Sequence, residues 1–437
     1  MKLVLGLGVT GLSVAKFFHK TNVDFTIADN RKSPPKLSEY IDLNIGPIAI
    51  LGDWTQSLLN DVDEVIISPG IPEDEKIVRW AKERDISVIS DIQLFGKNTK
   101  TPIIGITGSN GKSTVTKLIG NMIKDSGKKV AIGGNFGKPA LDLLNQNVDF
   151  YVLELSSYQL DYTSELNLEA GVVLNITPDH LDRYGDFESY ISSKLKIYEF
   201  TKKKIFNLDE KNIESNFKQA CFSINIPKKA SDFGTVTCHG TCFLLKGDDV
   251  LMPIGDWQLI GEHNVSNVLA ALSLGDQIGL NVDSMTNTIR EFKGLEHRLE
   301  WVIKKGDIDF YNDSKATNAI SALKAIKALS NFYENIVLIA GGIPKKEDYS
   351  ELFEVIEDKI SALVLIGEGS DFFEKNVTKV KTYKTSSMTE AVTKASSLIK
   401  SGVVLLSPAC ASFDMFENFE DRGKQFKEAI KLQEWFD

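Results

Sequence analysis

Short apolar runs that end in glycine constrain the fold of this chain more than any other feature. Two of them, Leu3–Gly6 and Ile103–Gly108, are each followed by a helical pattern. Apolar strands that alternate with helices are typical of parallel sheets built from βαβ units. The chain is therefore predicted to be an α/β protein with mainly parallel sheets. Further strands are predicted at residues 24–28, 64–68, 129–132, 150–154, 171–175, 335–340, 362–367 and 402–407.

The length of the chain predicts more than one domain. A single hydrophobic core seldom grows beyond ~250–300 residues. At about 150 residues per domain, the 437 residues suggest about three domains. We place boundaries near residue 94, beside a polar segment, and near residue 298, after Gly294. The predicted domains are a Rossmann-like domain at 1–93, a central α/β domain at 94–297 and a C-terminal Rossmann-like domain at 298–437.

Composition and charge exclude several classes of protein. The chain is 42% hydrophobic and 25% charged, which argues against a disordered, collagenous or membrane-spanning protein. No apolar run approaches the ~20 residues of a spanning helix, and Met1–Leu5 leads directly into glycines instead of a signal-peptide core. The net charge of −10 argues against the overall basic surface of a nucleic-acid-binding protein. We expect a cytoplasmic chain that binds neither nucleic acid nor membranes.

The cysteines predict neither a disulfide scaffold nor a metal site. Four cysteines are too few for a disulfide scaffold in a chain of this length. Cys238 and Cys242 flank His239, but no second Cys/His pair at suitable spacing completes a metal site. Ordinary thiols are therefore expected at these positions.

The first glycine motif is GLGVTG at residues 6–11, placed between a predicted strand and a helix. It matches the dinucleotide fingerprint G-x-G-x-x-G, in which backbone N–H groups approach a pyrophosphate at the helix N-terminus. Asp29 follows the next strand, where an acidic residue usually meets a ribose hydroxyl or a base. By itself the motif leaves three interpretations open: NAD, another diphosphate such as a nucleotide sugar, or a glycine turn that only permits close packing.

The second glycine motif is TGSNGKST at residues 107–114, again between a strand and a helix. Lys112 can reach the β- and γ-phosphates of a nucleotide, and Ser113 can bind Mg²⁺. The motif is a variant of the P-loop, because Ile106 stands where the strict form has glycine. It predicts a nucleoside triphosphate site in the central domain, with a solvent-exposed helix cap as the alternative.

Polar groups follow several other predicted strands, where ligands of open α/β sheets bind. Glu154 ends a strand of the central domain, as expected for an acidic residue that binds Mg²⁺ in a P-loop protein. His180 lies in the polar segment after the next strand; the alternative is a hydrogen-bonded structural histidine. In the third domain, segments 311–318 and 407–412 predict a site for a small anionic ligand. Asp313 or Ser412 could instead be only a helix cap.

Six motifs occur in order along the chain: Thr107–Thr114, Glu154–Ser157, Asn175–Asp182, His263-Asn264, Glu296–Arg298 and Asn312–Asn318. In order and spacing they resemble those of the Mur ligases, which are ATP-dependent amide-forming enzymes of bacterial peptidoglycan precursor synthesis. The 6–11 turn and the segment 407–419 are most similar to members that add D-glutamate to UDP-N-acetylmuramoyl-L-alanine. The resemblance implies a Rossmann-like domain for a UDP-sugar instead of NAD, then a P-loop ATPase-type domain and an amino-acid domain.

The resemblance also implies the reaction and its partners. ATP phosphorylates the carboxylate of UDP-N-acetylmuramoyl-L-alanine, and the amine of D-glutamate attacks the acyl phosphate to form an amide. Lys112, His180 and Lys194 are the implied catalytic residues, and the enzyme is expected to be a monomer. Two Mg²⁺ ions are expected, one held by Ser113 and Glu154 and the other by His180 and a carbamate formed on Lys194. From sequence alone, Lys194 would instead be a surface lysine on a helix.

Three groups of binding residues follow from the same resemblance. The implied ATP contacts are Gly108, Ser109, Asn110, Gly111, Lys112, Ser113, Thr114, Asn264, Arg298 and Asp313. The implied UDP-sugar contacts are Val9, Thr10, Asp29, Asn30, Ser68, Pro69, Gly70 and Asn135. The implied amino-acid contacts are Thr317, Lys345, Ser412 and Phe419, with Lys346 as the alternative to its neighbour.

Two other functions are weighed against this one. Another amide ligase of the same fold would share the central domain and differ in its amino-acid pocket or N-terminal domain. An NAD-dependent oxidoreductase would account for residues 6–11, but not for Lys112, Glu154 and His180 together. A nucleotide-binding switch would leave the third domain without a ligand.

Overall fold

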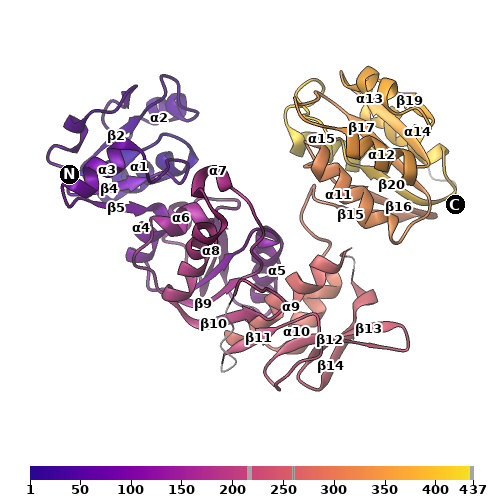
Figure 1. The fold of residues 1–437 in the computed structure, drawn as a ribbon, viewed down its shortest axis with the longest axis horizontal. Coiled ribbons are helices and arrows are strands. Elements are labelled where there is room, and N and C mark those ends of the chain that lie inside the picture. The colour runs from indigo at the N-terminus through magenta and orange to yellow at the C-terminus, as the bar shows by residue number, and fades with distance from the viewer. Residues whose placement is uncertain (214–218, 258, 260, 434–437) are drawn as a thin grey trace. The chain divides into compact units, whose positions relative to one another are not determined.

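The computed structural model describes residues 1–213, 219–257, 259 and 261–433 and forms two compact units (Figure 1). The first unit comprises residues 1–255 and 265–289, and the second comprises 256–264 and 290–437. Each described unit is an α/β structure, and most strand pairs are parallel. The predicted α/β class and mainly parallel sheets are therefore confirmed. The domain boundaries near residues 94 and 298 stay predictions.

The first sheet of the first unit is parallel throughout, with the order β3-β2-β1-β4-β5. Consecutive strands proceed outward from β1 on one side, and the order then jumps to β4 on the other side. This reversal opens a crevice at the carboxyl ends of β1 and β4, where ligands of such sheets bind. The strands are β1 (Lys2–Leu5), β2 (Phe25–Asp29), β3 (Ile50–Leu51), β4 (Glu64–Ile67) and β5 (Ser87–Ser90). The helices are α1 (Val9–Thr21), α2 (Leu37–Leu43), η1 (Gln56–Leu59), α3 (Lys76–Glu83) and α4 (Asp91–Lys97).

The second sheet has the order β14-β13-β12-β11-β10-β9-β6-β8-β7; the pairs β12–β13 and β13–β14 are antiparallel, and the other described pairs are parallel. Strand β6 lies between β9 and β8, is fully buried and leads into the second glycine motif. The strands are β6 (Ile103–Thr107), β7 (Val130–Gly134), β8 (Phe150–Glu154), β9 (Leu168–Val173), β10 (Thr201–Asn207), β11 (Ala220–Phe222), β12 (Phe233–Cys238), β13 (Thr241–Lys246) and β14 (Asp249–Pro253). The helices are α5 (Lys112–Asp125), η2 (Ala140–Leu143), α6 (Ser157–Asp161), α7 (Leu181–Tyr184), α8 (Phe187–Leu195), η3 (Lys196–Phe200), α9 (Glu262–Gln277) and α10 (Val282–Glu291).

The second unit has one sheet, with the order β15-β16-β20-β17-β18-β19. Only the edge strand β15 pairs antiparallel, and neither it nor the β12–β14 hairpins were predicted from the sequence. The strands are β15 (Glu300–Lys305), β16 (Asp307–Asn312), β17 (Ile336–Gly341), β18 (Ala362–Ile366), β19 (Thr382–Lys384) and β20 (Ser401–Leu406). The helices are α11 (Ala319–Ser330), α12 (Ser350–Lys359), α13 (Ser370–Asn376), α14 (Met388–Ser397) and α15 (Phe419–Leu432), and η4 (Ile254–Asp256) precedes them.

The two sheets of the first unit share one hydrophobic core. Phe95 of α4 packs edge-on against Tyr151 of β8, with ring centroids 5.0 Å apart. Polar contacts reinforce this junction: Ser90 caps α4 and bonds the hydroxyl of Thr163, while Gln159 donates to Asp91 at 3.3 Å. The two glycine motifs follow strands of these two sheets. Because the contacts hold the sheets together, they also fix the first motif relative to the second.

Burial at this junction predicts a pH-dependent stability. Asp91 is buried, and desolvation raises its pKa from the usual 3.8 to about 6. The folded chain therefore binds the proton of the Asp91 carboxyl group more tightly than the unfolded chain does. Protonation of Asp91 contributes its full stabilisation of the folded state below pH 3.8, and this contribution is lost as the pH rises through about 6. At pH 8 we expect the free energy of unfolding of Asp91→Asn to exceed that of the wild type by roughly 2 kcal/mol. The variant should therefore unfold at a higher temperature.

Thermal unfolding of the wild type and Asp91→Asn at pH 4, 6 and 8 measures this effect. The difference should vanish near pH 4, where the carboxyl group of Asp91 is protonated in the folded chain. Asp42→Asn, at an exposed position of α2, is the matched control and should show no such dependence. A constant difference between wild type and Asp91→Asn at all three pH values would contradict the prediction.

Candidate active site

A cavity of about 510 Å³ opens at the carboxyl ends of the first sheet. All eight residues predicted to contact a UDP-sugar line it, although Asn135 comes from the second sheet. The structure therefore brings together residues that are up to 126 positions apart in the sequence, from Val9 to Asn135. Those eight are Val9, Thr10, Asp29, Asn30, Ser68, Pro69, Gly70 and Asn135.

Asp29 braces the glycine-rich turn of this cavity. Its buried carboxylate accepts the N–H of Leu7 at 2.7 Å and both the backbone and side-chain N–H groups of Arg31 at 2.6–2.9 Å. Burial opposes ionisation, but these donors hold the pKa of Asp29 below its usual value. Gly11 is required in the same turn, since a Cβ there would collide with the carbonyl oxygen of Gly6. The first glycine motif is therefore both tightly packed and anchored to a buried carboxylate.

Five further residues that no sequence motif indicated line the cavity: Arg31, Trp54, Ile71, Pro72 and Glu75. Arg31 follows Asn30 on the same loop, and Trp54 lies in the connection after β3. The indole N–H of Trp54 is buried and has no hydrogen-bond partner among the described residues. No motif spacing indicates Arg31 or Trp54, because each reaches the cavity only through the path of its loop.

The second glycine motif wraps around the side chain of Lys112. This lysine is the first residue of α5, and its Nζ donates to the carbonyl oxygens of Gly108 at 2.7 Å and Ser109 at 3.0 Å. Gly108 and Gly111 have positive φ angles of 152° and 82°. Ile106 is fully buried in β6, so the departure from the strict P-loop pattern lies in the strand and not in the loop. Thr114 follows Ser113 on the first turn of the helix.

The segment that follows β9 holds this loop in place. The Asn175 side chain accepts the N–H of Asn110 at 2.8 Å, and its Nδ2 donates back to the Asn110 carbonyl at 3.1 Å. Ser109 bonds the Thr177 carbonyl oxygen and the Tyr190 hydroxyl, at 3.1 and 3.0 Å. The predicted polar segment 175–182 is thus directly attached to the predicted nucleotide loop.

Oxygen donors suited to a hard cation meet beside the loop. Glu154, at the end of β8, is 3% exposed; it accepts the Ser113 hydroxyl and the Asn135 amide, both at 2.7 Å. Hydroxyl and carboxylate oxygens are the ligands that Mg²⁺ prefers, so Ser113 and Glu154 fit the ion that the sequence predicts. No cluster of three or more His, Cys, Asp or Glu side chains arranged for a metal was found among the described residues.

Lys194 is buried against the same loop. Only 2% of it is exposed, and its Nζ donates to the Gly108 carbonyl oxygen at 2.9 Å, which is also an acceptor for Lys112. Burial and the nearby charge of Lys112 lower the pKa of Lys194 to about 7. Its Nζ also lies 4.7 Å from the centroid of the Tyr190 ring. The surface lysine that the sequence alone would favour is wrong: the helix α8 turns this side chain inward.

His180 lies at the start of α7 with a positive φ of 53°. Its ring centroid is 5.0 Å from that of Tyr158, and its Nε2 is 3.5 Å from the carboxylate of Asp179. The Tyr190 ring, which lies beside Lys194, is 6.3 Å away from it. Two tyrosine rings therefore flank His180, whose side chain is 46% exposed, and one of them, Tyr190, bonds Ser109 of the second glycine motif.

The second unit carries the other predicted ATP contacts, namely Asn264, Arg298 and Asp313. Asp313 follows β16 and is buried; its carboxylate accepts the Ser407 hydroxyl at 2.8 Å and the Leu299 N–H at 3.0 Å. Burial raises the pKa of Asp313 to about 7. Arg298 is exposed, and Asn264 donates its N–H to the carbonyl oxygen of Gly261.

The predicted amino-acid contacts lie at the carboxyl ends of β16, β17 and β20 of the same sheet, and at the first turn of α15. Lys345 Nζ lies 3.4 Å from the Thr317 hydroxyl, while Lys346 has no described contact with Thr317. Ser412 is 2% exposed, and Phe419 is the first residue of α15.

Arg422 ties together the two loops of this region, and the sequence did not indicate it. It is fully buried, and it donates to the hydroxyl and carbonyl oxygens of Ser314 and to the carbonyl oxygen of Cys410 at 2.8–3.0 Å. Burial lowers its pKa to about 10. Ser314 in turn donates its hydroxyl to the carbonyl oxygen of Phe419 at 2.8 Å. A buried cation therefore sets the spacing of loops 312–318 and 407–412.

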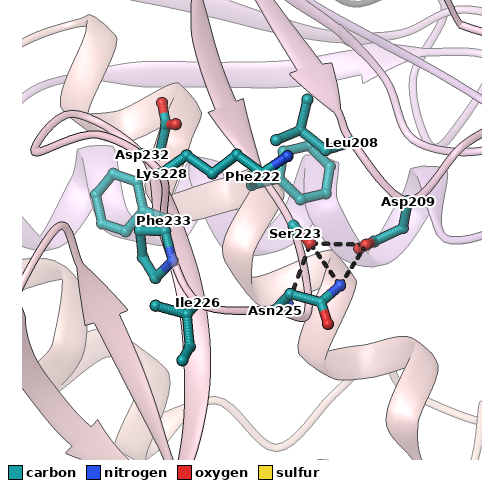
Figure 2. Close-up of a pocket in the computed structure, with 10 residues that line it drawn as sticks. Leu208, Asp209, Phe222, Ser223, Asn225, Ile226, Lys228, Asp232 and Phe233 are labelled. Atoms are coloured by element: carbon teal, nitrogen blue, oxygen red, sulfur yellow. Dashed lines mark hydrogen bonds between the residues drawn. The ribbon is translucent and has the colours of Figure 1, made fainter.

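A smaller cavity of about 230 Å³ lies at β10, β11 and β12, and Figure 2 shows its lining. Asp209 at one wall is saturated by donors from Ser223, Ile224 and Asn225. Phe222 and Phe233 contribute apolar side chains to the lining. None of the predicted site residues lines this cavity. Separately, no helix among the described residues is both long and apolar enough to cross a membrane.

Three family models match the chain in order. They are the MurD-like N-terminal domain of Mur ligases at residues 1–90, the Mur ligase middle domain at 106–275 and the Mur ligase glutamate ligase domain at 297–410. The chain belongs to the Mur ligase family. The middle-domain match spans the nucleotide loop, Glu154, His180 and Lys194.

Curated Mur ligases align along almost the whole chain. A UDP-N-acetylmuramoylalanine–D-glutamate ligase of Coxiella burnetii is 39% identical over 99% of this chain and 98% of its own length. Ligases of the same name from Nitrosococcus oceani and Acinetobacter baylyi are each 40% identical over 98% of this chain and cover 96% and 97% of their own lengths.

Solved structures share the Mur ligase fold at lower identity. A UDP-N-acetylmuramoyl-L-alanyl-D-glutamate–2,6-diaminopimelate ligase matches with a TM-score of 0.61 and 17% identity, over 94% of this chain and 92% of its own. A UDP-N-acetylmuramate-alanine ligase of Thermotoga maritima matches with a TM-score of 0.57 and 17% identity, over 98% and 99%. At this identity the likeness concerns the fold alone.

Proposed function

We propose that this chain is an ATP-dependent ligase that joins D-glutamate to UDP-N-acetylmuramoyl-L-alanine in peptidoglycan precursor synthesis. The observation that carries the proposal is the near-complete alignment, at about 40% identity, with ligases of that name. The geometry supports it, since the predicted UDP-sugar residues line one cavity and the nucleotide loop is built around Lys112. Because ATP and UDP-linked precursors are cytoplasmic metabolites, we place the reaction in the cytoplasm, carried out by a monomer.

The nucleotide loop and its lysine neutralise the phosphates of ATP. The backbone N–H groups of residues 108–114 face a triphosphate at the start of α5, where the helix dipole favours negative charge. Lys112 exchanges its contacts with the Gly108 and Ser109 carbonyls for the β- and γ-phosphates. We assign Asn264 and Asp313 to the adenosine portion, and Arg298 to the phosphates.

Ser113 and Glu154 would hold one Mg²⁺, and His180 with modified Lys194 would hold a second. When bound, the ions supply charge neutralisation at the transferring phosphoryl group. Glu154 is already in place for this role, because Asn135 and Ser113 orient its two oxygens. Asn135 also lines the first cavity, so one amide connects the sugar-binding and metal-binding regions.

Carbamylation of Lys194 resolves an electrostatic conflict. An ammonium group buried beside Lys112 would repel both that lysine and a cation. The ammonium group first loses one proton, and attack of the neutral amine nitrogen on CO₂ then forms an N–C bond and releases a second proton. The two steps together replace a buried cation by an anion. Burial of the side chain shields such a carbamate from exchange with solvent.

The other two substrates are assigned to the remaining loops. The cavity of the first sheet takes the uridine and diphosphate, with Val9, Thr10 and the Asp29-Asn30 pair nearest the glycine turn. Thr317, Lys345, Ser412 and Phe419 take D-glutamate, whose carboxylates suit the Lys345 ammonium group and the hydroxyls. The acyl phosphate formed from ATP loses phosphate when the amine of D-glutamate attacks its carbonyl carbon.

Phosphate release tests the proposed function directly. We expect purified protein with ATP, Mg²⁺ and UDP-N-acetylmuramoyl-L-alanine to release phosphate when D-glutamate is added, at least ~100-fold faster than with L-glutamate, L-lysine or meso-diaminopimelate. A site that pairs every carboxylate of the right isomer leaves polar groups unpaired with the wrong one, which gives discrimination of this size. Equal rates with all four amino acids would overturn the assignment of D-glutamate, and no ATP-dependent release with any of them would overturn the ligase.

A further inference from the structure

One side chain connects the first cavity to the turn that carries His180. Arg183 lies on α7 (Figure 1), three residues after His180, and its backbone N–H donates to the His180 carbonyl oxygen at 3.0 Å. Its guanidinium group donates from Nη1 to the carbonyl oxygen of Pro69 at 2.8 Å and from Nη2 to that of Ile71 at 3.1 Å. The side chain thus spans from the second sheet to a loop of the first sheet, 112–114 residues earlier in the chain.

The loop that Arg183 grips is a wall of the cavity. Pro69, Gly70 and Ile71 all line it, directly after β4. Tyr162 supports the same loop, because its hydroxyl donates to the carbonyl oxygen of Ile71 at 3.1 Å. The Ile71 carbonyl oxygen therefore accepts two hydrogen bonds, and both donors, Tyr162 and Arg183, lie in segments that connect strands of the second sheet.

The position of the guanidinium is itself constrained. Its carbon lies 3.9 Å from the centroid of the Tyr158 ring, and this ring is also the neighbour of His180 at 5.0 Å. A planar guanidinium can stack on a ring while donating in two directions within its plane, and a lysine ammonium cannot. Tyr158 therefore contacts both Arg183 and His180, and Arg183 in turn contacts the cavity wall.

We propose that Arg183 is a positioning residue that holds the wall of the UDP-sugar cavity in register with His180. This inference rests on the proposed function. The reacting carboxylate belongs to the substrate in the first cavity, whereas the phosphoryl group comes from the nucleotide loop. Two charge-assisted bonds to backbone carbonyls fix the loop at residues 69–71 without contributing any atom to the reaction.

Steady-state kinetics of Arg183→Lys separate positioning from a merely structural role. Lysine keeps the charge but cannot make both bonds and stack, so we expect the KM for UDP-N-acetylmuramoyl-L-alanine to rise about tenfold. The KM for ATP should stay within twofold of the wild type, because Arg183 has no described contact with residues 107–114. A residue that only stabilised the fold would lower the melting temperature and the active fraction without changing the KM of one substrate.

Two further variants sharpen the test. Tyr162→Phe removes the other donor to Ile71 and should raise the same KM about threefold, with less than multiplicative effects when combined with Arg183→Lys. Arg84→Lys is the matched control, because Arg84 is exposed in the described structure and contacts Asn60 instead of residues 69–71. A KM for the UDP-substrate within twofold of the wild type in both Arg183→Lys and Arg183→Met would overturn the proposal.

Calorimetric binding distinguishes this outcome from failure of the proposed function. If the wild type released no phosphate with D-glutamate, the ligase assignment would be wrong. The Kd for UDP-N-acetylmuramoyl-L-alanine would still test the positioning role, with about tenfold weaker binding expected in folded Arg183→Lys. Equal Kd values in wild type and variant would then overturn it.

Discussion

Lys112→Met will reduce the rate of ATP-dependent phosphate release by about 10³-fold or more. Lys112 is the cation at the centre of the nucleotide loop, and its ammonium group is held within the loop by the Gly108 and Ser109 carbonyls. Phosphoryl transfer depends on neutralising the charge that spreads over the phosphate oxygens, and a preorganised cation contributes several kcal/mol to that step. Methionine has a similar length and no charge, so the loop should keep its shape.

The rate of phosphate release under saturating substrates measures this effect, together with the melting temperature. Lys117→Met is the matched control, because Lys117 is exposed on the same helix, α5. The control should retain the wild-type rate. A Lys112→Met enzyme with a rate within tenfold of the wild type would show that the loop does not bind the transferred phosphate.

Lys194→Ala will abolish turnover, and formate or acetate will restore part of it. Alanine removes the carbamate that we assign to this position and leaves a space beside the Gly108 carbonyl. A small carboxylate can enter such a space and supply the missing anionic oxygens, whereas a small amine cannot. The partial rescue therefore distinguishes loss of an anion from loss of a cation or of packing.

Turnover of Lys194→Ala is measured in three parallel titrations, with formate, acetate or methylammonium. Each is raised to about 0.2 M, because ionic screening at higher concentrations would itself affect turnover. Lys202→Ala removes an exposed lysine that pairs only with Glu169 in the described structure, and it should remain active and insensitive to carboxylates. Rescue by methylammonium, or unchanged turnover of Lys194→Ala, would contradict the carbamate.

The cavity of the first sheet, which we assign to the UDP-sugar, shows how much of a binding site can be predicted from sequence patterns. The glycine motif at 6–11 and the acidic residue at the end of the next strand have local geometric reasons, and both are present in the structure. Arg31 and Trp54 line the same cavity but have no such reason, because they lie on loops whose path depends on packing. Their identification needed the folded chain.

In the second unit, too, some site residues could be predicted from the sequence and others could not. Polar residues after β16 and β20 could be predicted to share one edge of a sheet, because parallel strands end on the same side. Arg422 could not, since it lies within a helix whose sequence pattern is that of an ordinary surface helix with one buried side. Its charge is fully buried only because the loops that carry Ser314 and Cys410, about 100 residues apart in the sequence, pack around it.

The sequence by itself determined the α/β class, the glycine-rich turn at residues 107–114 and the strand ends that carry polar groups. These features depend on neighbouring residues, through strand burial, helix starts and glycines with positive φ angles. Only the tertiary structure decided that Lys194 is buried on Gly108, that Glu154 bonds Ser113 and Asn135, and that Arg183 grips the cavity wall. Such contacts join distant segments, and the burial that gives them their energy exists only once the sheets have packed.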